Sequence, residues 1–246
     1  MINNISFKIF LFFIEIIDYR NKQKVINFFK KKFSINPLTV IDIGAHKGET
    51  IKLILNNFNL KKMISFEPNQ FLYKKLIYDY SNENKIEILN LGVGEKNEIR
   101  KLNITIDSSS STFNKINRDS KYFLRKEKIL KYFSKNKNFI EKKQKIEIET
   151  LSNIIKKKEF CNIDILKIDT EGFELSVLKG INKQDFKKIK FIYFEHHFDL
   201  MIEKNYKFSD IDNLLKLNNF FPVLKIKMNF RKSFEYIYEN KEKNFS

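Results

Sequence analysis

The sequence predicts an α/β domain with a mostly parallel sheet and helices on both of its faces. From residue 38 onward, short apolar runs typical of buried strands alternate with stretches of helical periodicity. The first strand is LTVIDIG (38–44), and GETIKLILNNF (48–58) follows as an amphipathic helix. Strands and helices that alternate in this way form right-handed βαβ units, which produce a parallel sheet.

The next elements repeat the alternation. KMISFEP (62–68) is a second strand that Pro68 stops, and Asn69 is placed to cap the following helix. IEILNLG (86–92) is a third strand. Further strands are expected at 145–150, 162–169 and 188–197, with a helix near 151–158.

The carboxyl-terminal part predicts a helix and a closing pair of strands. Gly180 is expected to cap a short helix after residue 169. SDIDNLLKLNNF has Asp212 three residues after Ser209, an arrangement typical of a capping box. Residues 221–228 and 233–239 read as the final two strands.

Composition limits the possible classes of protein. The chain has 246 residues and 42% hydrophobic content, which suits one domain with its own core. Cys161 is the only cysteine, so a disulfide framework and a cysteine-based zinc site are excluded. We expect a reducing compartment, the cytoplasm.

The formal charge of +17 suggests an alternative, an RNA-binding protein or RNA methyltransferase that uses a basic surface. However, Lys, Asn and Ile are abundant and Arg is scarce, as in proteins with an AT-rich coding bias. The sequence also lacks a recognisable RNA-binding module. We therefore expect no specific nucleic-acid partner.

Residues 1–37 are predicted to form an N-terminal helical extension. Residues 5–17 are the most apolar stretch, but Lys8 and Glu15 interrupt it, and it is shorter than the roughly 20 residues of a membrane span. We expect the helix to cover the core or a dimer partner. Its lysine-rich flank leaves open a peripheral contact with a membrane surface.

The middle of the chain departs from the alternation. After a hairpin strand around 99–106, residues 107–145 show no clear strand pattern and are predicted to form an insertion or lid. The serine run 108–111 and nearby aromatic side chains are candidates for binding an acceptor, or else form a solvated loop. The aromatic candidates are Tyr122, Phe123, Tyr132 and Phe133.

The loop after the first strand points to a nucleoside-containing cofactor. Ligands of open parallel sheets bind beyond the carboxyl ends of the strands. Gly44 permits a tight turn there, and Gly48 permits close approach of a ligand. Glu67 ends the second strand 23 residues after Gly44, at a spacing that suits a carboxylate binding ribose hydroxyls.

The charge of this loop favours S-adenosylmethionine over NAD. A dinucleotide site requires G-x-G-x-x-G for the pyrophosphate, but here only Gly44 and Gly48 are present. Asp42 and Glu49 flank the loop, where carboxylates suit an ammonium group and repel a pyrophosphate. Alternatively, these two side chains only cap the turn and the helix.

Several motifs together resemble the FkbM-type methyltransferases. The motifs are DIGAHKGET, ISFEPN, LNLGVGEKNE, SSSST, KIDTEGFELSVLKG and IYFEHH, and they cover roughly residues 38–228. The resemblance implies a class I S-adenosylmethionine-dependent methyltransferase with a Rossmann-like fold, a seven-stranded sheet and an antiparallel last strand. It divides the chain into the extension 1–37 and a methyltransferase domain 38–246, and implies methylation of hydroxyl groups on sugars and natural products.

The resemblance also assigns the cofactor site. It implies that S-adenosylmethionine lies against Asp42, Gly44, His46 and Gly48, with its ribose on Glu67. The adenine is expected near the loop after the third strand, at Asn90, Gly92 and Val93. This sequence has His46 where the family often has asparagine, and Gly92 where it often has alanine.

The segment DILKIDTEGFE (164–174) is the predicted reaction end. Methyl transfer from a sulfonium to oxygen requires an aligned acceptor that loses its proton, and alignment contributes up to about 7 to 11 kcal/mol. Asp169 is the first candidate for the base or for orienting the acceptor, and Glu171 is close enough to share the site. Lys167 within a buried strand is expected to pair with Asp169 or Glu171.

Histidines at the end of the next strand complete the candidate set. Strand alternation places Glu195 and His197 on one face of the sheet and His196 on the other. One of the two histidines is expected to face a small-molecule or glycan acceptor, with His197 as the candidate, and the other to be a packing residue. A divalent ion bound by these groups is a minority alternative, because no ligand spacing is diagnostic.

Overall fold

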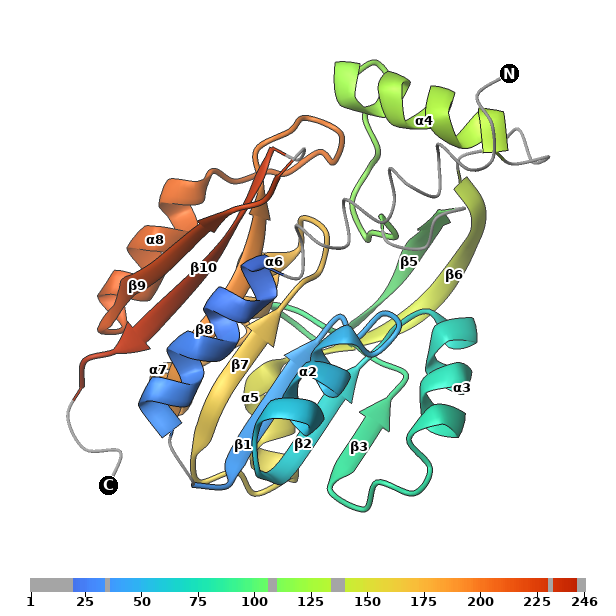
Figure 1. Cartoon of the computed structure of the whole chain (residues 1–246). Helices are drawn as coiled ribbons and strands as arrows, with labels where there is room; N and C mark the ends of the chain where they lie inside the picture. The colour runs from blue at the N-terminus through green and yellow to red at the C-terminus, as the bar shows by residue number, and fades with distance from the viewer. Residues whose placement is uncertain (1–19, 34–35, 106–109, 134–139, 230–231, 243–246) are drawn as a thin grey trace.

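The computed structural model describes residues 20–33, 36–105, 110–133, 140–229 and 232–242 (Figure 1). A seven-stranded sheet, with strand order β3-β2-β1-β7-β8-β10-β9, forms its centre. Strand β10 is antiparallel to β8 and β9, while the pairings among β3, β2, β1, β7 and β8 are parallel. The strands are β1 (Leu38–Ile43), β2 (Leu60–Phe66), β3 (Ile86–Leu89), β7 (Ile163–Ile168), β8 (Ile189–His197), β9 (Phe220–Lys227) and β10 (Ser233–Asn240). The predicted sheet, with its antiparallel last strand, is confirmed.

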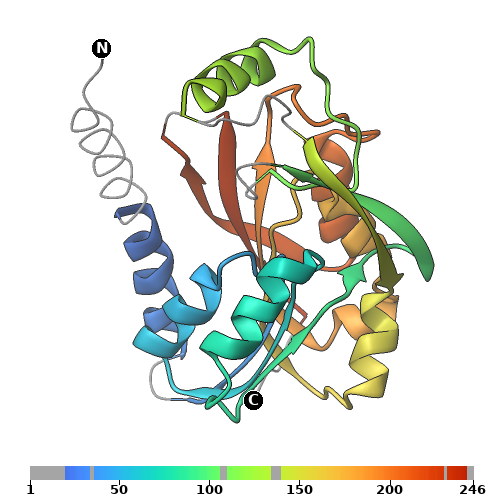
Figure 2. The same cartoon turned by 90° about the vertical axis from the view of Figure 1, so that its right-hand side faces the viewer.

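Helices cover both faces of this sheet, as the alternating periodicity predicts (Figure 2). One face packs against the helical residues 20–33, α2 (Glu49–Asn57) and α3 (Gln70–Asp79). The other face packs against α5 (Leu151–Lys157), α6 (Glu174–Lys179) and α8 (Phe208–Leu217). Every residue of β1 is buried, because its side chains alternate between these two layers of helices.

A smaller sheet lies beside the central one. It consists of β4 (Gly92–Val93), β6 (Ile140–Glu149) and β5 (Glu98–Thr105), in that order. The predicted insertion 107–145 therefore contains the first part of β6. It also contains the helix α4 (Lys121–Phe133), which stands over the edge of the central sheet where its parallel strands end (Figures 1 and 2).

The predicted caps are only partly confirmed. The Asn69 side chain accepts a hydrogen bond from the Phe71 N–H, and Gly180 ends α6. The capping box at Ser209 is wrong, because α8 begins at Phe208 with Lys207 as its cap. Asp210 accepts from the Lys207 N–H at 2.7 Å, while Asp212 binds the Tyr238 hydroxyl instead.

The helix over residues 20–33 is part of the core. Val25, Phe29 and Phe33 pack on the sheet, and each is at most 4% exposed. Phe29 makes an edge-to-face contact with Phe191 on β8, with ring centroids 5.7 Å apart. The apolar residues 5–17, for which the sequence leaves open a peripheral membrane contact, lie outside the described residues. None of the helices in the described part of the chain combines the length and apolarity of a membrane span.

Replacing Phe29 by alanine tests whether this helix belongs to the fold. Phe29 is 1% exposed, so truncation should create a cavity that lowers the free energy of unfolding by about 3 to 5 kcal/mol. Phe71→Ala on α3 is the control, because Phe71 is 77% exposed and its loss should change stability by less than about 0.5 kcal/mol. Urea denaturation of both variants gives these values, and equal effects would show that the helix does not pack as described.

Candidate functional site

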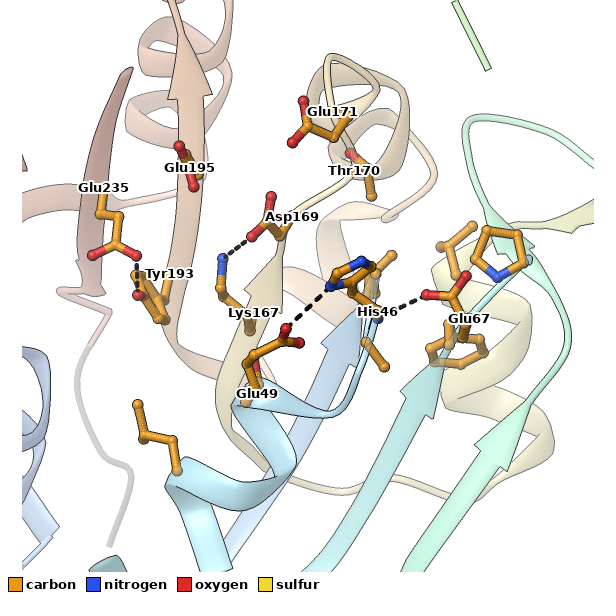
Figure 3. Close-up of a pocket in the computed structure, with 18 of the residues that line it drawn as sticks. His46, Glu49, Glu67, Lys167, Asp169, Thr170, Glu171, Tyr193, Glu195 and Glu235 are labelled. Carbon is orange, nitrogen blue, oxygen red and sulfur yellow. Dashed lines mark hydrogen bonds and ion pairs between the residues drawn. The ribbon is translucent and has the colours of Figure 1, made fainter. Parts of the chain in front are cut away.

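A cavity of about 350 Å³ opens at the carboxyl ends of the parallel strands (Figure 3). Its walls come from the loops after β1, β2, β3 and β7, from β8 and β10, and from the helical residues 20–33. This volume lies within the range of small-molecule sites, roughly 300 to 1,000 Å³. The predicted site residues on its wall are Gly44, His46, Glu67, Gly92, Val93, Lys167, Asp169 and Glu171.

Gly44 allows the loop after β1 to contact the end of β7. Its φ of 90° lies in the left-handed region, and a Cβ there would lie 1.9 Å from the backbone oxygen of Asp169. No other residue fits that space. The close approach joins the predicted cofactor loop directly to the predicted reaction end.

Gly48 lies at the start of the helix α2 and does not contact the cavity. It is the N-cap of α2 with φ 84°, and a Cβ there would meet the hydroxyl and ring of Tyr80 on α3. It does not line the cavity wall. The glycine therefore permits close packing of α2 against the end of α3.

His46 and Glu49 form a pair at the mouth of the loop. The His46 Nδ1 lies 3.1 Å from Glu49 Oε1, and Glu49 Oε2 accepts from the Lys47 N–H. Burial opposes ionisation of Glu49, but the hydrogen bond and charge of His46 lower its pKa to about 2. Glu49 thus holds the loop in place and also lines the cavity. The two predicted roles of this residue, capping the helix and facing a ligand, are therefore compatible.

Glu67 ends β2 with its carboxylate held by the backbone. Oε2 accepts from the His46 N–H and Oε1 accepts from the Asn69 N–H, each at 2.7 Å. Burial raises the pKa of Glu67 to about 7, against the opposing effect of these two hydrogen bonds. Each oxygen retains a second lone pair, so the side chain can also accept from two ligand hydroxyls.

Asp42 lies beneath the cavity and not on its wall. It is fully buried, beside Ser65 and Lys167 in the strand register, and the Ser65 hydroxyl donates to Oδ2 at 3.4 Å. Oδ1 has no hydrogen-bond partner among the described residues. Burial raises the pKa of Asp42 to about 7, even though Lys167 opposes the shift. The structure therefore does not support the predicted direct contact between Asp42 and a ligand.

The loop after β3 supplies an apolar wall. Leu91, Gly92 and Val93 line the cavity, with Pro68 beside them. Asn90 does not line it, because its side-chain amide donates to the backbone oxygens of Glu67 and Pro68 at 2.8 and 2.9 Å. Asn90 therefore holds the turn that carries Glu67.

Lys167 is the buried cation of the reaction end (Figure 3). Its Nζ lies 3.2 Å from Asp169 Oδ2, and 4.5 Å from the ring centroid of Tyr193 on β8. Burial alone would lower the pKa of Lys167, but the carboxylates of Asp169 and Glu235 outweigh it and raise the pKa. The sequence left open whether Lys167 pairs with Asp169 or with Glu171, and in the structure its partner is Asp169.

The two histidines at the end of β8 have different surroundings. His197 lies between Glu171 and Glu195, at 3.6 and 3.4 Å from Nε2, with Asp199 3.6 Å from Nδ1. Burial alone would lower the pKa of His197, but the carboxylates, Glu171 foremost, raise it to about 10. His197 therefore supports Glu171 and Glu195 from behind the cavity wall.

His196 faces the opposite side, as strand alternation predicts. It is 3% exposed and packs against the rings of Phe198, Tyr206 and Phe208. Burial lowers its pKa to about 3. His196 is therefore the packing residue of the pair.

Glu171 does not cap the following helix. The residue has a φ of 50°, and it is Glu174 that accepts from the Gly172 N–H at 2.9 Å. Burial raises the pKa of Glu171 to about 7, although His197 acts in the opposite direction. Glu171 is therefore available to a ligand in the cavity.

Several wall residues were not predicted from the sequence. Tyr193, Glu195 and Glu235 reach the cavity through the alternation and register of β8 and β10. For Glu195 the sequence predicts only that it shares a face of the strand with His197. From the predicted insertion, Ser111 and Phe113 reach the wall, whereas Phe123 is buried with Met201 and Ile202. The helical residues 20–33 contribute Asn21, Lys22, Val25 and Phe29.

The described residues contain no group of three or more His, Cys, Asp or Glu side chains arranged to hold a metal ion. The carboxylates of the cavity are instead spread along its wall, from Glu67 on β2 to Glu235 on β10. Their arrangement suits several separate polar contacts with one organic ligand.

The chain is similar to known proteins in sequence and in fold. A family model described as the methyltransferase FkbM domain matches residues 42–222. The chain is similar to the crystal structure of an FkbM methyltransferase from Methylobacillus flagellatus, with a TM-score of 0.50 and 16% identity over 82% of this chain and 44% of that one. It is also similar to the methyltransferase domain of METTL16, with a TM-score of 0.51 and 10% identity over 91% of this chain and 68% of that one.

These likenesses confirm the predicted class I methyltransferase fold, Rossmann-like in its sheet and helices. The chain spans less than half the length of the FkbM structure from Methylobacillus flagellatus. Among curated proteins, none matches the sequence.

Asp42→Asn tests the electrostatic description of the site. The pKa of Asp42 is raised from 3.8 to about 7, so the folded state binds a proton that the unfolded chain releases. This carboxyl group therefore destabilises the fold progressively as pH rises from about 4 to about 7. Asparagine does not titrate, so the melting temperature of the variant minus that of the wild type should increase between about pH 5 and pH 8. If the difference in melting temperature stays constant or decreases over this range, Asp42 is not a buried carboxyl group with a raised pKa.

Proposed function

The chain belongs to the FkbM methyltransferase family, and we propose that it transfers a methyl group to a hydroxyl of a saccharide or glycosylated metabolite. As a member of this family it is an S-adenosylmethionine-dependent enzyme. One observation carries the proposal: Glu67, suited to a ribose, and Asp169, suited to a reacting hydroxyl, line the same cavity. The loop at Gly44 joins the two ends.

The residues of the cavity fit the cofactor. Glu67 presents carboxylate lone pairs to the two ribose hydroxyls, beside the apolar surface of Pro68, Leu91 and Val93, which suits an adenine. Glu49 and Asp169 place negative charge along the part of the wall that a sulfonium and an ammonium would contact. When bound, S-adenosylmethionine supplies an activated methyl group on its sulfonium sulfur.

Asp169 is the residue best placed to deal with the acceptor proton. Its Oδ2 is held by Lys167, while Oδ1 makes no hydrogen bond to the described residues. Oδ1 can therefore accept the hydroxyl proton of an acceptor, which contributes roughly a hundred- to ten-thousandfold to the rate. The ion pair fixes the carboxylate, and Glu171 and Glu195 extend the polar wall for other hydroxyls of the acceptor.

The charges of the cavity disfavour the alternative of an RNA substrate. Six carboxylates line it, at Glu49, Glu67, Asp169, Glu171, Glu195 and Glu235. These groups would repel the phosphates that dominate protein–RNA contacts. The positive net charge of the chain is therefore not concentrated at this cavity.

Calorimetric titration should show that the protein binds S-adenosylmethionine with micromolar affinity and does not bind NAD. Glu67→Gln should weaken S-adenosylmethionine binding by roughly tenfold or more, because a hydrogen bond to a charged group is worth about 1.5 to 3 kcal/mol. NAD binding, or an unchanged affinity in this variant, would contradict the assignment of the cofactor end.

Asp169→Asn should leave cofactor affinity within a few-fold of wild type and reduce turnover by about a hundredfold or more. Turnover is measured as transfer of a labelled methyl group to a glycan and metabolite extract, with products identified by mass spectrometry. Asp79→Asn, an exposed position at the end of α3, is the control and should retain activity. Unchanged turnover in Asp169→Asn would place the base elsewhere.

A further inference from the structure

The half of the cavity beyond Asp169 has more negative than positive charge. Its carboxylates come from two strands and one loop: Glu195 on β8, Glu235 on β10, and Asp169 and Glu171 in the loop after β7. Lys167 is the buried cation on its wall, and Lys22 lies exposed at the rim. His197, behind the wall, is shared among Glu171, Glu195 and Asp199.

Glu195 and Glu235 face each other directly. They are register partners on the antiparallel strands β8 and β10, and they are 6% and 8% exposed. Like charges directly opposite on neighbouring strands destabilise a sheet. Buried carboxylates are costly unless they are fully paired, and His197 beside Glu195 and the Tyr193 hydroxyl on Glu235 compensate this pair only in part.

Each of the two carboxylates has one oxygen that lacks a hydrogen bond. The Tyr193 hydroxyl donates to Glu235 Oε1 at 2.6 Å, but Glu235 Oε2 has no partner among the described residues. Glu195 Oε1 lies 3.4 Å from His197 Nε2 without forming a hydrogen bond. Native proteins satisfy most buried polar groups, so Glu235 Oε2, which has neither a hydrogen bond nor an ion pair among the described residues, indicates a missing donor.

A protonated amine has the properties that this part of the wall requires. It carries a positive charge and three N–H donors, which match two carboxylate oxygens and relieve their repulsion. A neutral hydroxyl supplies a donor but no charge. A divalent ion is less well suited, because the described residues do not form a metal-binding group of three or more ligands.

We propose that the methyl acceptor carries a protonated amine, and that Glu195 and Glu235 bind this amine while Asp169 faces the hydroxyl that is methylated. The acceptor class is then an amino sugar, or a glycosylated metabolite with an amine substituent. This inference rests on the proposed function, because it concerns the acceptor of that same reaction.

The electrostatics of Glu235 agree with this assignment. Burial raises the pKa of Glu235, and the neighbouring Glu195 acts in the same direction, although Lys167 and the Tyr193 hydroxyl partly compensate. A bound cation between Glu195 and Glu235 would reverse this effect. A positive group at this place would therefore add to the partial compensation that Lys167 and the Tyr193 hydroxyl provide.

Binding of three matched sugars to the full chain, saturated with S-adenosylhomocysteine, tests the proposal. Glucosamine, N-acetylglucosamine and glucose share one sugar ring and differ only in the substituent at one carbon. That substituent is charged in glucosamine and neutral in the other two. Glucosamine should bind at least about tenfold more tightly than either neutral sugar at neutral pH, as followed by NMR titration. In Glu235→Gln this preference should fall to about threefold or less, and Glu195→Gln is a second variant with the same expected effect.

Glu239→Gln is the matched control. Glu239 lies on the same strand β10 but pairs with Lys32 and does not line the cavity, so the preference for glucosamine should remain. Glucosamine binding no tighter than that of the neutral sugars, including no binding of any of the three, overturns the inference. Binding of S-adenosylhomocysteine is measured in the same samples, so failure of the proposed function is detected separately.

Discussion

The side chain of Lys167 lies among carboxylates from β1, β8, β10 and the loop after β7, and the arrangement of the site depends on this one buried cation. It pairs with Asp169, which follows its own strand, and lies over Tyr193 on β8, whose hydroxyl in turn binds Glu235 on β10. Asp42 on β1 is its register neighbour. Without this cation, Asp169, Glu235 and Asp42 would lose the positive charge that compensates them in a buried region, which is far more costly than a paired arrangement.

The two ends of the cavity have different origins in the chain. The cofactor end is built from the loops after β1, β2 and β3, which lie within the residues that match the family model. The acceptor end is closed by Asn21, Lys22, Val25 and Phe29, which precede that match. The helix that supplies them packs on the sheet through the contact of Phe29 with Phe191, so one element contributes both to the core and to the proposed acceptor end.

Sequence reasoning predicted the parts of the site that follow from strand ends. Gly44, Glu67 and Asp169 each end a parallel strand, and the ends of parallel strands meet at one edge of a sheet. It missed Tyr193 and Glu235, because their positions depend on the register of β8 and β10, which are far apart in sequence. Asp42 and Gly48 were expected to contact the cofactor. Instead, Asp42 is buried between neighbouring strands and Gly48 packs against Tyr80, and both contacts depend on tertiary structure that the local sequence does not reveal.

The most direct test of the account is a crystal structure of the full chain with S-adenosylhomocysteine. The account predicts that the ribose binds to Glu67, the adenine lies on Leu91 and Val93, and the sulfur faces Asp169 across the cavity. Glu195 and Glu235 should remain uncovered, on the side left for the acceptor. A product molecule bound outside this cavity, or one whose sulfur points away from Asp169, would contradict the central claim that one cavity holds both methyl donor and acceptor.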